Sequence, residues 1–101
     1  MYYFIVNPNS RSGKGALIWK DLEGILNERN VEYKTFFTEY RGHAVLLSKS
    51  ITSDAAPENP VTLIAVGGDG TIQEVLSGVH DLSCITFGYI PTGSGNDFCR
   101  G

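Results

Sequence analysis

The sequence predicts an α/β fold with three layers, in which a mostly parallel sheet is covered by helices on both faces. Strand-like and helix-like stretches alternate along the chain as β-α units, which is typical of this class. The strand-like runs are almost continuously apolar, as expected for strands buried on both faces. The connections between them are too long for hairpins, so successive strands should run parallel.

Four runs rich in apolar, β-branched and aromatic residues are the predicted strands. Each is bounded by Gly, Pro or Asn on at least one side, and these residues commonly end strands. The runs are Tyr2–Val6, Val31–Phe37, Val61–Val66 and Cys84–Ile90.

Three stretches with apolar residues at helical spacing are the predicted helices. They cover about Lys14–Glu28, Gly42–Ser53 and Thr71–Val79. The apolar face of the first helix is formed by Leu17, Ile18, Leu22, Ile25 and Leu26. Trp19 interrupts this face, so we expect half-exposed packing for its ring.

The composition describes an ordinary soluble domain. The 101 residues fit one hydrophobic core, and 42% hydrophobic with 19% charged residues is typical of a globular chain. A net charge of -3 gives no basic field for nucleic acid. Two cysteines without a CxxC motif indicate a reducing compartment, and the first residues lack the pattern of a signal peptide. We therefore expect a cytoplasmic protein.

The first predicted strand leads into a loop of small polar residues with two basic ones, Asn7–Gly15. Such a loop before a helix can cradle an anion. An ordinary connection with Ser12 or Gly13 near the helix cap explains it equally well, so both interpretations stay open. A Walker phosphate loop does not fit, because Pro8 stands where that motif needs Gly and Gly15 where it needs Ser or Thr.

The third predicted strand ends in a loop with three glycines in four residues, Gly67–Thr71. Glycines let the backbone turn sharply and approach a ligand, and the helix that follows favours negative charge at its start. Asp69 would repel a phosphate unless Mg²⁺, a ribose hydroxyl or a basic side chain intervenes. A tight turn with a Thr cap is the alternative, but it leaves one glycine unexplained.

The fourth predicted strand ends in a second loop of glycine, hydroxyl and amide residues, which contains Ser94. The carboxyl ends of parallel strands meet at one edge of a sheet, so the two glycine loops should face one crevice. The dinucleotide fingerprint GxGxxG is absent from these loops, which disfavours a Rossmann dehydrogenase.

Four motifs, one after each strand, together resemble the diacylglycerol kinase catalytic domain. They are NPxSxxGKG, a Thr before GHA, GGDGTIxEV and IPxGSxNDFxR. The GGDGT loop is shared with NAD kinase and phosphofructokinase, whereas the last motif is similar to the lipid-kinase branch. The resemblance implies that residues 1–101 form the N-terminal ATP-binding domain, with the NAD kinase/diacylglycerol kinase-like fold. It also implies that a β-rich, lipid-binding C-terminal domain, which carries the general base, is absent from these residues.

The resemblance implies ATP and Mg²⁺ as cofactors and a set of nucleotide-binding positions. These are Asn7, Pro8, Asn9, Ser10, Arg11, Thr38, Gly67, Gly68, Asp69, Gly70, Thr71, Ile72, Gln73 and Ser94. Asp69 would organise the metal or the phosphates, and no other metal ligand is assigned. Four positions depart from the family pattern: Arg11 replaces a Gly, Gln73 and Ser77 each replace an Asn, and Ser94 replaces a Thr. The longer Gln73 side chain bears on nucleotide affinity.

The function implied by the resemblance is transfer of the γ-phosphate of ATP to a lipid hydroxyl by a longer protein. The lipid would bind through the missing domain, so the 101 residues alone should be inactive. A soluble kinase of the NAD kinase type and a non-catalytic nucleotide-binding module remain alternatives. Peripheral membrane contact and a homodimer are left open, and no nucleic-acid partner is expected.

Overall fold

The computed structural model describes residues 1–79 and 82–92. Its elements follow each other in the predicted alternation of strands and helices. In chain order they are β1 (Tyr2–Val6), α1 (Ser10–Glu28), β2 (Tyr33–Phe37), α2 (His43–Thr52), β3 (Val61–Gly67), α3 (Asp69–Gly78), the short 3-10 turn η1 (Leu82–Cys84) and β4 (Ile85–Pro91).

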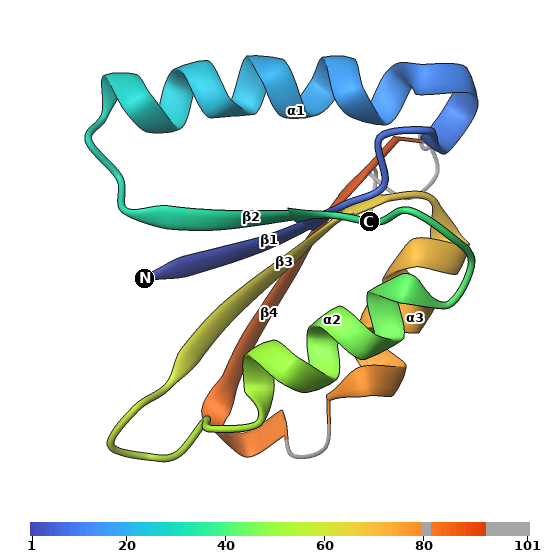
Figure 1. Ribbon diagram of the computed structural model, residues 1–101. Coiled ribbons are helices and arrows are strands. Elements are labelled where there is room, and N and C mark those ends of the chain that lie inside the picture. The colour runs from blue at the N-terminus through green and yellow to red at the C-terminus, as the bar shows by residue number, and fades with distance from the viewer. Residues whose placement is uncertain (80–81, 93–101) are drawn as a thin grey trace.

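The strands form a parallel sheet with the order β2-β1-β3-β4. Helix α1 covers one face, and α2 with α3 covers the other (Figure 1). The three-layer α/β prediction is therefore confirmed.

A separate apolar cluster lies on each face of the sheet, because neighbouring residues of a strand point to opposite sides. On β1, Phe4 and Val6 belong to the cluster under α1, whereas Ile5 belongs to the cluster under α2 and α3. All three side chains are at most 2% exposed. Strand β1 is thus buried on both faces, as its continuous apolar run predicts.

The prediction that Trp19 is half exposed was wrong. Its side chain is 4% exposed, whereas Leu17, which the predicted apolar face included, is 66% exposed. The Trp19 ring lies with its centroid 5.1 Å from that of Phe4 and 5.7 Å from that of Tyr33. The large aromatic ring fills the space between α1 and the sheet, so the helix is rotated slightly from the orientation that the aliphatic residues alone predict.

Two helices begin earlier than predicted. Helix α1 begins at Ser10 rather than near Lys14, and its first turn contains Gly13 at a φ of 96°, which glycine adopts without strain. Helix α3 begins at Asp69 rather than Thr71, because Gly68 is its N-cap and the Gly68 carbonyl accepts from the N–H of Ile72 at 3.1 Å. The glycine loop is therefore partly the first turn of α3.

The two edge strands are also shifted from their predicted bounds. Strand β2 begins at Tyr33 rather than Val31, and β4 begins one residue later than predicted, because Cys84 is the last residue of η1. These shifts leave the carboxyl ends of the strands at the predicted loops.

Helices α2 and α3 pack closely because small residues line their contact. A Cβ on Gly78 would overlap the backbone carbonyl oxygen of Val45. The buried Ser48 hydroxyl donates to the carbonyl of Val75 at 2.6 Å. The two helices therefore form one unit on their face of the sheet.

Candidate functional site

The carboxyl ends of β1 and β3 form the topological switch point of the sheet. The chain leaves β1 through α1 toward β2, and it leaves β3 through α3 toward β4, on the other side (Figure 1). The loops after two neighbouring strands therefore diverge. In open parallel sheets ligands bind at such a point.

Backbone hydrogen bonds tie the four strand ends into one row. The N–H of Thr38, after β2, donates to Val6 at 2.9 Å, and the N–H of Asn7 donates to Val66 at 2.9 Å. The N–H of Thr92, after β4, donates to Gly67 at 3.0 Å. The loops thus start from a fixed platform.

Asn7 connects the loop after β1 to the start of α3. Its Nδ2 donates to Thr71 Oγ1 at 3.3 Å, and its Oδ1 accepts from the backbone N–H of Asn9 at 3.1 Å. Both ends of this side chain are engaged within the protein. Asn7 therefore acts on the shape of the loops that flank the switch point.

The three glycines of the GGDGT loop have different surroundings. A Cβ on Gly67 would lie 2.6 Å from Thr71 Oγ1, so a side chain there would force Thr71 to move. Apart from its chain neighbours and the backbone of α3, a Cβ on Gly68 or Gly70 would have no atom of the described residues within 4 Å. Packing therefore explains Gly67, whereas no contact among the described residues explains Gly68 or Gly70.

The backbone N–H groups at the start of α3 lie beside Gly68 and Gly70. The first N–H groups of a helix lack partners within the helix and lie at the positive end of its dipole. Among the described residues, α3 has no side-chain cap hydrogen bond, and Asp69 is an exposed acid in its first turn. The arrangement suits an anion that approaches the backbone, with a cation near Asp69.

The loop after β1 is folded inward. Ser10 is 8% exposed and shares a hydrogen bond with the hydroxyl of Thr92, which is 1% exposed. A Cβ on Gly15 would overlap the carbonyl oxygen of Asn7. The hydroxyl of Ser10 is thus engaged with Thr92, directly after β4, whereas Asn9 is exposed.

The loop after β2 is anchored on α3. The N–H of Gly42 donates to both carboxylate oxygens of Glu74, each at 3.2 Å. Within the loop, the N–H of Glu39 donates to His43 Nδ1 at 2.9 Å, and the Tyr40 ring stacks on His43 with centroids 4.5 Å apart. His43 therefore has a structural role in this loop.

The structure brings most of the predicted nucleotide positions to this one edge. They are Asn7, Pro8, Asn9, Ser10, Thr38 and the run from Gly67 to Gln73. The Ile72 side chain is 7% exposed and belongs to the core under α2 and α3, whereas Gln73 is exposed. Ser94 and the rest of its loop lie outside the described residues, as does the side chain of Arg11.

Two residues at this edge were not predicted. Thr92 was passed over in favour of Ser94, although it directly follows the last strand as Thr38 follows the second. Glu74 stands in the GGDGTIxEV motif, but its partner Gly42 is 32 residues away in the sequence. No local pattern indicates such a contact.

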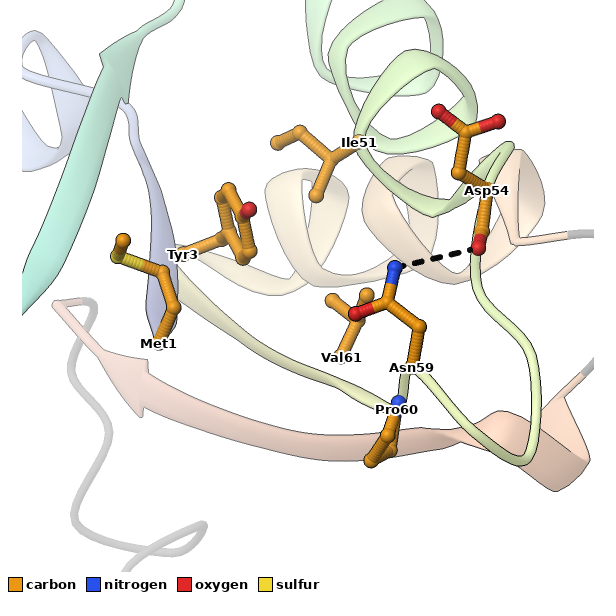
Figure 2. Close-up of a pocket in the computed structure, with 7 residues that line it drawn as sticks. All are labelled: Met1, Tyr3, Ile51, Asp54, Asn59, Pro60 and Val61. Carbon is orange, nitrogen blue, oxygen red and sulfur yellow. Dashed lines mark hydrogen bonds between the residues drawn. The ribbon is translucent and has the colours of Figure 1, made fainter.

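A hollow of about 200 Å³ lies at the opposite edge of the sheet, where β1 and β3 begin (Figure 2). It is lined by Met1, Tyr3, Ile51, Asp54, Asn59, Pro60 and Val61. Asn59 Nδ2 donates to the backbone carbonyl of Asp54 at 3.5 Å across one side of it. This hollow is separate from the loops at the switch point.

Comparison with known proteins decides the family. The model of the diacylglycerol kinase catalytic domain matches residues 1–101, the whole chain. The chain belongs to the diacylglycerol kinase catalytic domain family. Both the predicted resemblance and the predicted fold of this family are confirmed.

Relatives of this chain include the putative lipid kinase YtlR of Bacillus subtilis, 39% identical over 100 residues, which are 99% of this chain and 32% of YtlR. The diacylglycerol kinase of Staphylococcus aureus is 38% identical over 97 residues, covering 95% of this chain and 30% of that protein. A solved Bacillus anthracis structure superposes with a TM-score of 0.75 at 26% identity, covering 98% of this chain and 34% of that one. The chain thus spans about a third of the length of these relatives.

Among residues 1–79 and 82–92, no helix has the length and apolar character needed to cross a bilayer.

Proposed function

We propose that this domain binds ATP and that the complete gene product transfers the γ-phosphate to a lipid hydroxyl. One observation carries the proposal: beside the β1/β3 switch point, α3 begins with Gly68 and Gly70, where a Cβ would meet no other element of the described residues. Membership in the diacylglycerol kinase family supports the start of α3 as a nucleotide site.

The start of α3 would hold the phosphates of ATP. Its first N–H groups can donate to phosphate oxygens, and the helix dipole favours their charge. Without a Cβ at Gly68 and Gly70, the oxygens can approach the backbone closely. The Asn7–Thr71 hydrogen bond holds the first loop beside this helix start before ATP binds. A preformed site loses less entropy on binding.

Asp69 fits a Mg²⁺ ion that ATP itself brings. Mg²⁺ is commonly held by one or two carboxylates together with substrate phosphates and water. Asp69 is exposed in the first turn of α3, and the part of the chain that the structure describes has no cluster of three or more His, Cys, Asp or Glu side chains that could hold a metal alone. When bound, the ion would neutralise phosphate charge. Asp69 would thus hold the ion at the phosphate end of the site.

A lipid is the proposed acceptor because a relative named diacylglycerol kinase covers 95% of this chain. We place the acceptor site and the general base in the remainder of the protein, since this chain corresponds to about a third of its relatives. The residues of this domain would position and neutralise the phosphates, which supply most of the catalysis in phosphoryl transfer.

Transfer of labelled γ-phosphate tests the proposal. The complete gene product is incubated with ATP, Mg²⁺ and either diacylglycerol in mixed micelles or NAD. We expect label in the lipid, and Asp69→Ala should lower kcat/KM by about 100-fold, as loss of a transition-state charge contact does.

Asp54→Ala is the matched control, because Asp54 is exposed at the opposite edge of the sheet. Label in NAD alone would support a soluble kinase instead. Binding of ATP without transfer to either acceptor would support a non-catalytic module.

A further inference from the structure

Glu74 makes a contact that the nucleotide site as described does not use. It lies in the second turn of α3, is half-buried, and accepts the N–H of Gly42 through both carboxylate oxygens at 3.2 Å. Gly42 is the N-cap of α2, at a φ of 91° that suits glycine. A side chain of α3 therefore caps a different helix, α2.

The Glu74 carboxylate takes the part that the glutamate of a capping box has, because it accepts from the backbone N–H of the N-cap residue itself. Gly42 has no side chain that could bind the next N–H groups of α2, so the anchoring of this helix start falls to the backbone and to Glu74. The Glu74 carboxylate also faces the positive end of the α2 dipole, and hydrogen bonds to a charged acceptor are stronger than neutral ones. The start of α2 is thus anchored by Glu74, which is distant in the sequence.

The loop between β2 and α2 is fixed at both ends by residues of the nucleotide edge. Its first residue, Thr38, donates its N–H to Val6 of β1 at 2.9 Å. Its last residue, Gly42, is held by Glu74 of α3. Helix α3 is the same helix whose first turn begins at Asp69. The Glu74 contact therefore sets where this loop stands relative to the start of α3.

Contacts inside the loop connect it to the first turn of α2. His43, in the first turn of α2, accepts from the backbone of Glu39, and its ring stacks on Tyr40 at an interplanar angle of 12°. The loop is thus folded against the start of α2. If α2 lost its anchor at Gly42, residues 38–42 would shift with it.

We propose that Glu74 is a positioning residue for nucleotide binding. By capping α2 it holds the Thr38–Gly42 loop in place beside the start of α3, and so raises the affinity for ATP without contacting it. This inference rests on the proposed nucleotide site. It adds Glu74, which lies where α3 contacts the start of α2, as a residue that influences that site.

Three substitutions in the complete gene product separate the hydrogen bond from the charge. Glu74→Ala removes both. Glu74→Gln removes the charge but keeps a carbonyl oxygen at the same reach, whereas Glu74→Asp keeps the charge but shortens the side chain by one methylene. Glu58→Ala is the control for loss of a carboxylate, because Glu58 is exposed in the loop before β3.

Loss of a charge-assisted hydrogen bond that orders the loop should raise the KM for ATP about tenfold in Glu74→Ala and Glu74→Asp. We expect Glu74→Gln to stay within about threefold of the wild type, since a neutral hydrogen bond has about half the strength. The value of kcat at saturating ATP and the KM for lipid should change little in all variants. Amide hydrogen exchange of residues 38–43, measured without ATP, should speed up in Glu74→Ala and Glu74→Asp only.

Several results would overturn the inference. An unchanged KM for ATP in Glu74→Ala, or a wild-type value in Glu74→Asp with a raised value in Glu74→Gln, would show that the hydrogen bond does not position the loop. If Glu74→Ala does not fold, the Gln and Asp variants decide alone. A wild-type protein that binds no ATP would contradict the proposed function itself, whereas normal binding by the wild type and all Glu74 variants would contradict only this inference.

Discussion

Substituting Gly70 with alanine should make the domain more stable and yet a weaker binder of ATP. Gly70 lies in the first turn of α3, and a Cβ there would have no described atom within 4 Å. Alanine in place of glycine within a helix stabilises by about 0.5–1 kcal/mol. The same methyl group would stand where a phosphate oxygen approaches the backbone. Loss of one charge-assisted hydrogen bond, about 1.5–3 kcal/mol, raises the Kd about 10- to 100-fold.

Gly67→Ala is the matched variant with the opposite expectation for stability. Its Cβ would lie 2.6 to 2.9 Å from three side-chain atoms of Thr71, so Thr71 must move. Overpacking of this kind costs about 1–3 kcal/mol. Urea unfolding and calorimetric titration with ATP, on the same preparations, measure both quantities. A Gly70→Ala protein that is less stable than the wild type, or that binds ATP as the wild type does, would refute the reasoning. In that case Gly67 would not serve packing alone, with Gly70 serving phosphate binding.

Two further predictions concern residues around the site. Thr92→Val leaves the buried Ser10 hydroxyl without its partner, so chemical denaturation should show a loss of about 1–3 kcal/mol, and Ser10→Ala in the same protein should restore part of it. Desolvation and the Glu23 carboxylate raise the pKa of Tyr33 above 10.0. The folded state then holds this proton more tightly, so the free energy of unfolding falls as the pH rises above 10.0, and Tyr33→Phe should fall less. An equal fall in the free energy of unfolding of the wild type and Tyr33→Phe would show that Tyr33 does not cause this pH dependence.

The fold class could be predicted because the composition of the strands distinguishes them from the rest of the sequence. The runs at β1 and β3 are apolar without alternation, which requires burial on both faces, and helical stretches separate them. The predicted helix starts were less accurate. Gly13 has a positive φ inside the first turn of α1, and Gly68 is the extended N-cap of α3, and glycine does not itself indicate on which side of it a helix begins.

The orientation of α1 could not be predicted from spacing alone. Leu17 and Trp19 both fit the edge of an apolar stripe, and the side that is buried depends on the shape of the surface beneath. In the structure that surface is aromatic, with Phe4 and Tyr33 around Trp19. The ring therefore turns inward, and Leu17 is left exposed.

The candidate site, too, could be predicted only in part. The GGDGT loop was predicted because three glycines around an acid are unusual at a strand end. The roles within it were not, since only the packing separates Gly67 from Gly70. The contact of Glu74 with Gly42 joins two helices across 32 positions and has no local signature.

The central claim is that ATP phosphates bind at the start of α3, at the β1/β3 switch point. Backbone amide spectra of the protein, recorded while ATP and Mg²⁺ are added, test it most directly. The account predicts that the largest shifts occur at the N–H groups of Gly68, Asp69, Gly70 and Thr71, with small shifts at Asp54 and Asn59 in the hollow at the opposite edge. Shifts centred on that hollow, or unchanged amides at the start of α3 under saturating ATP, would contradict it.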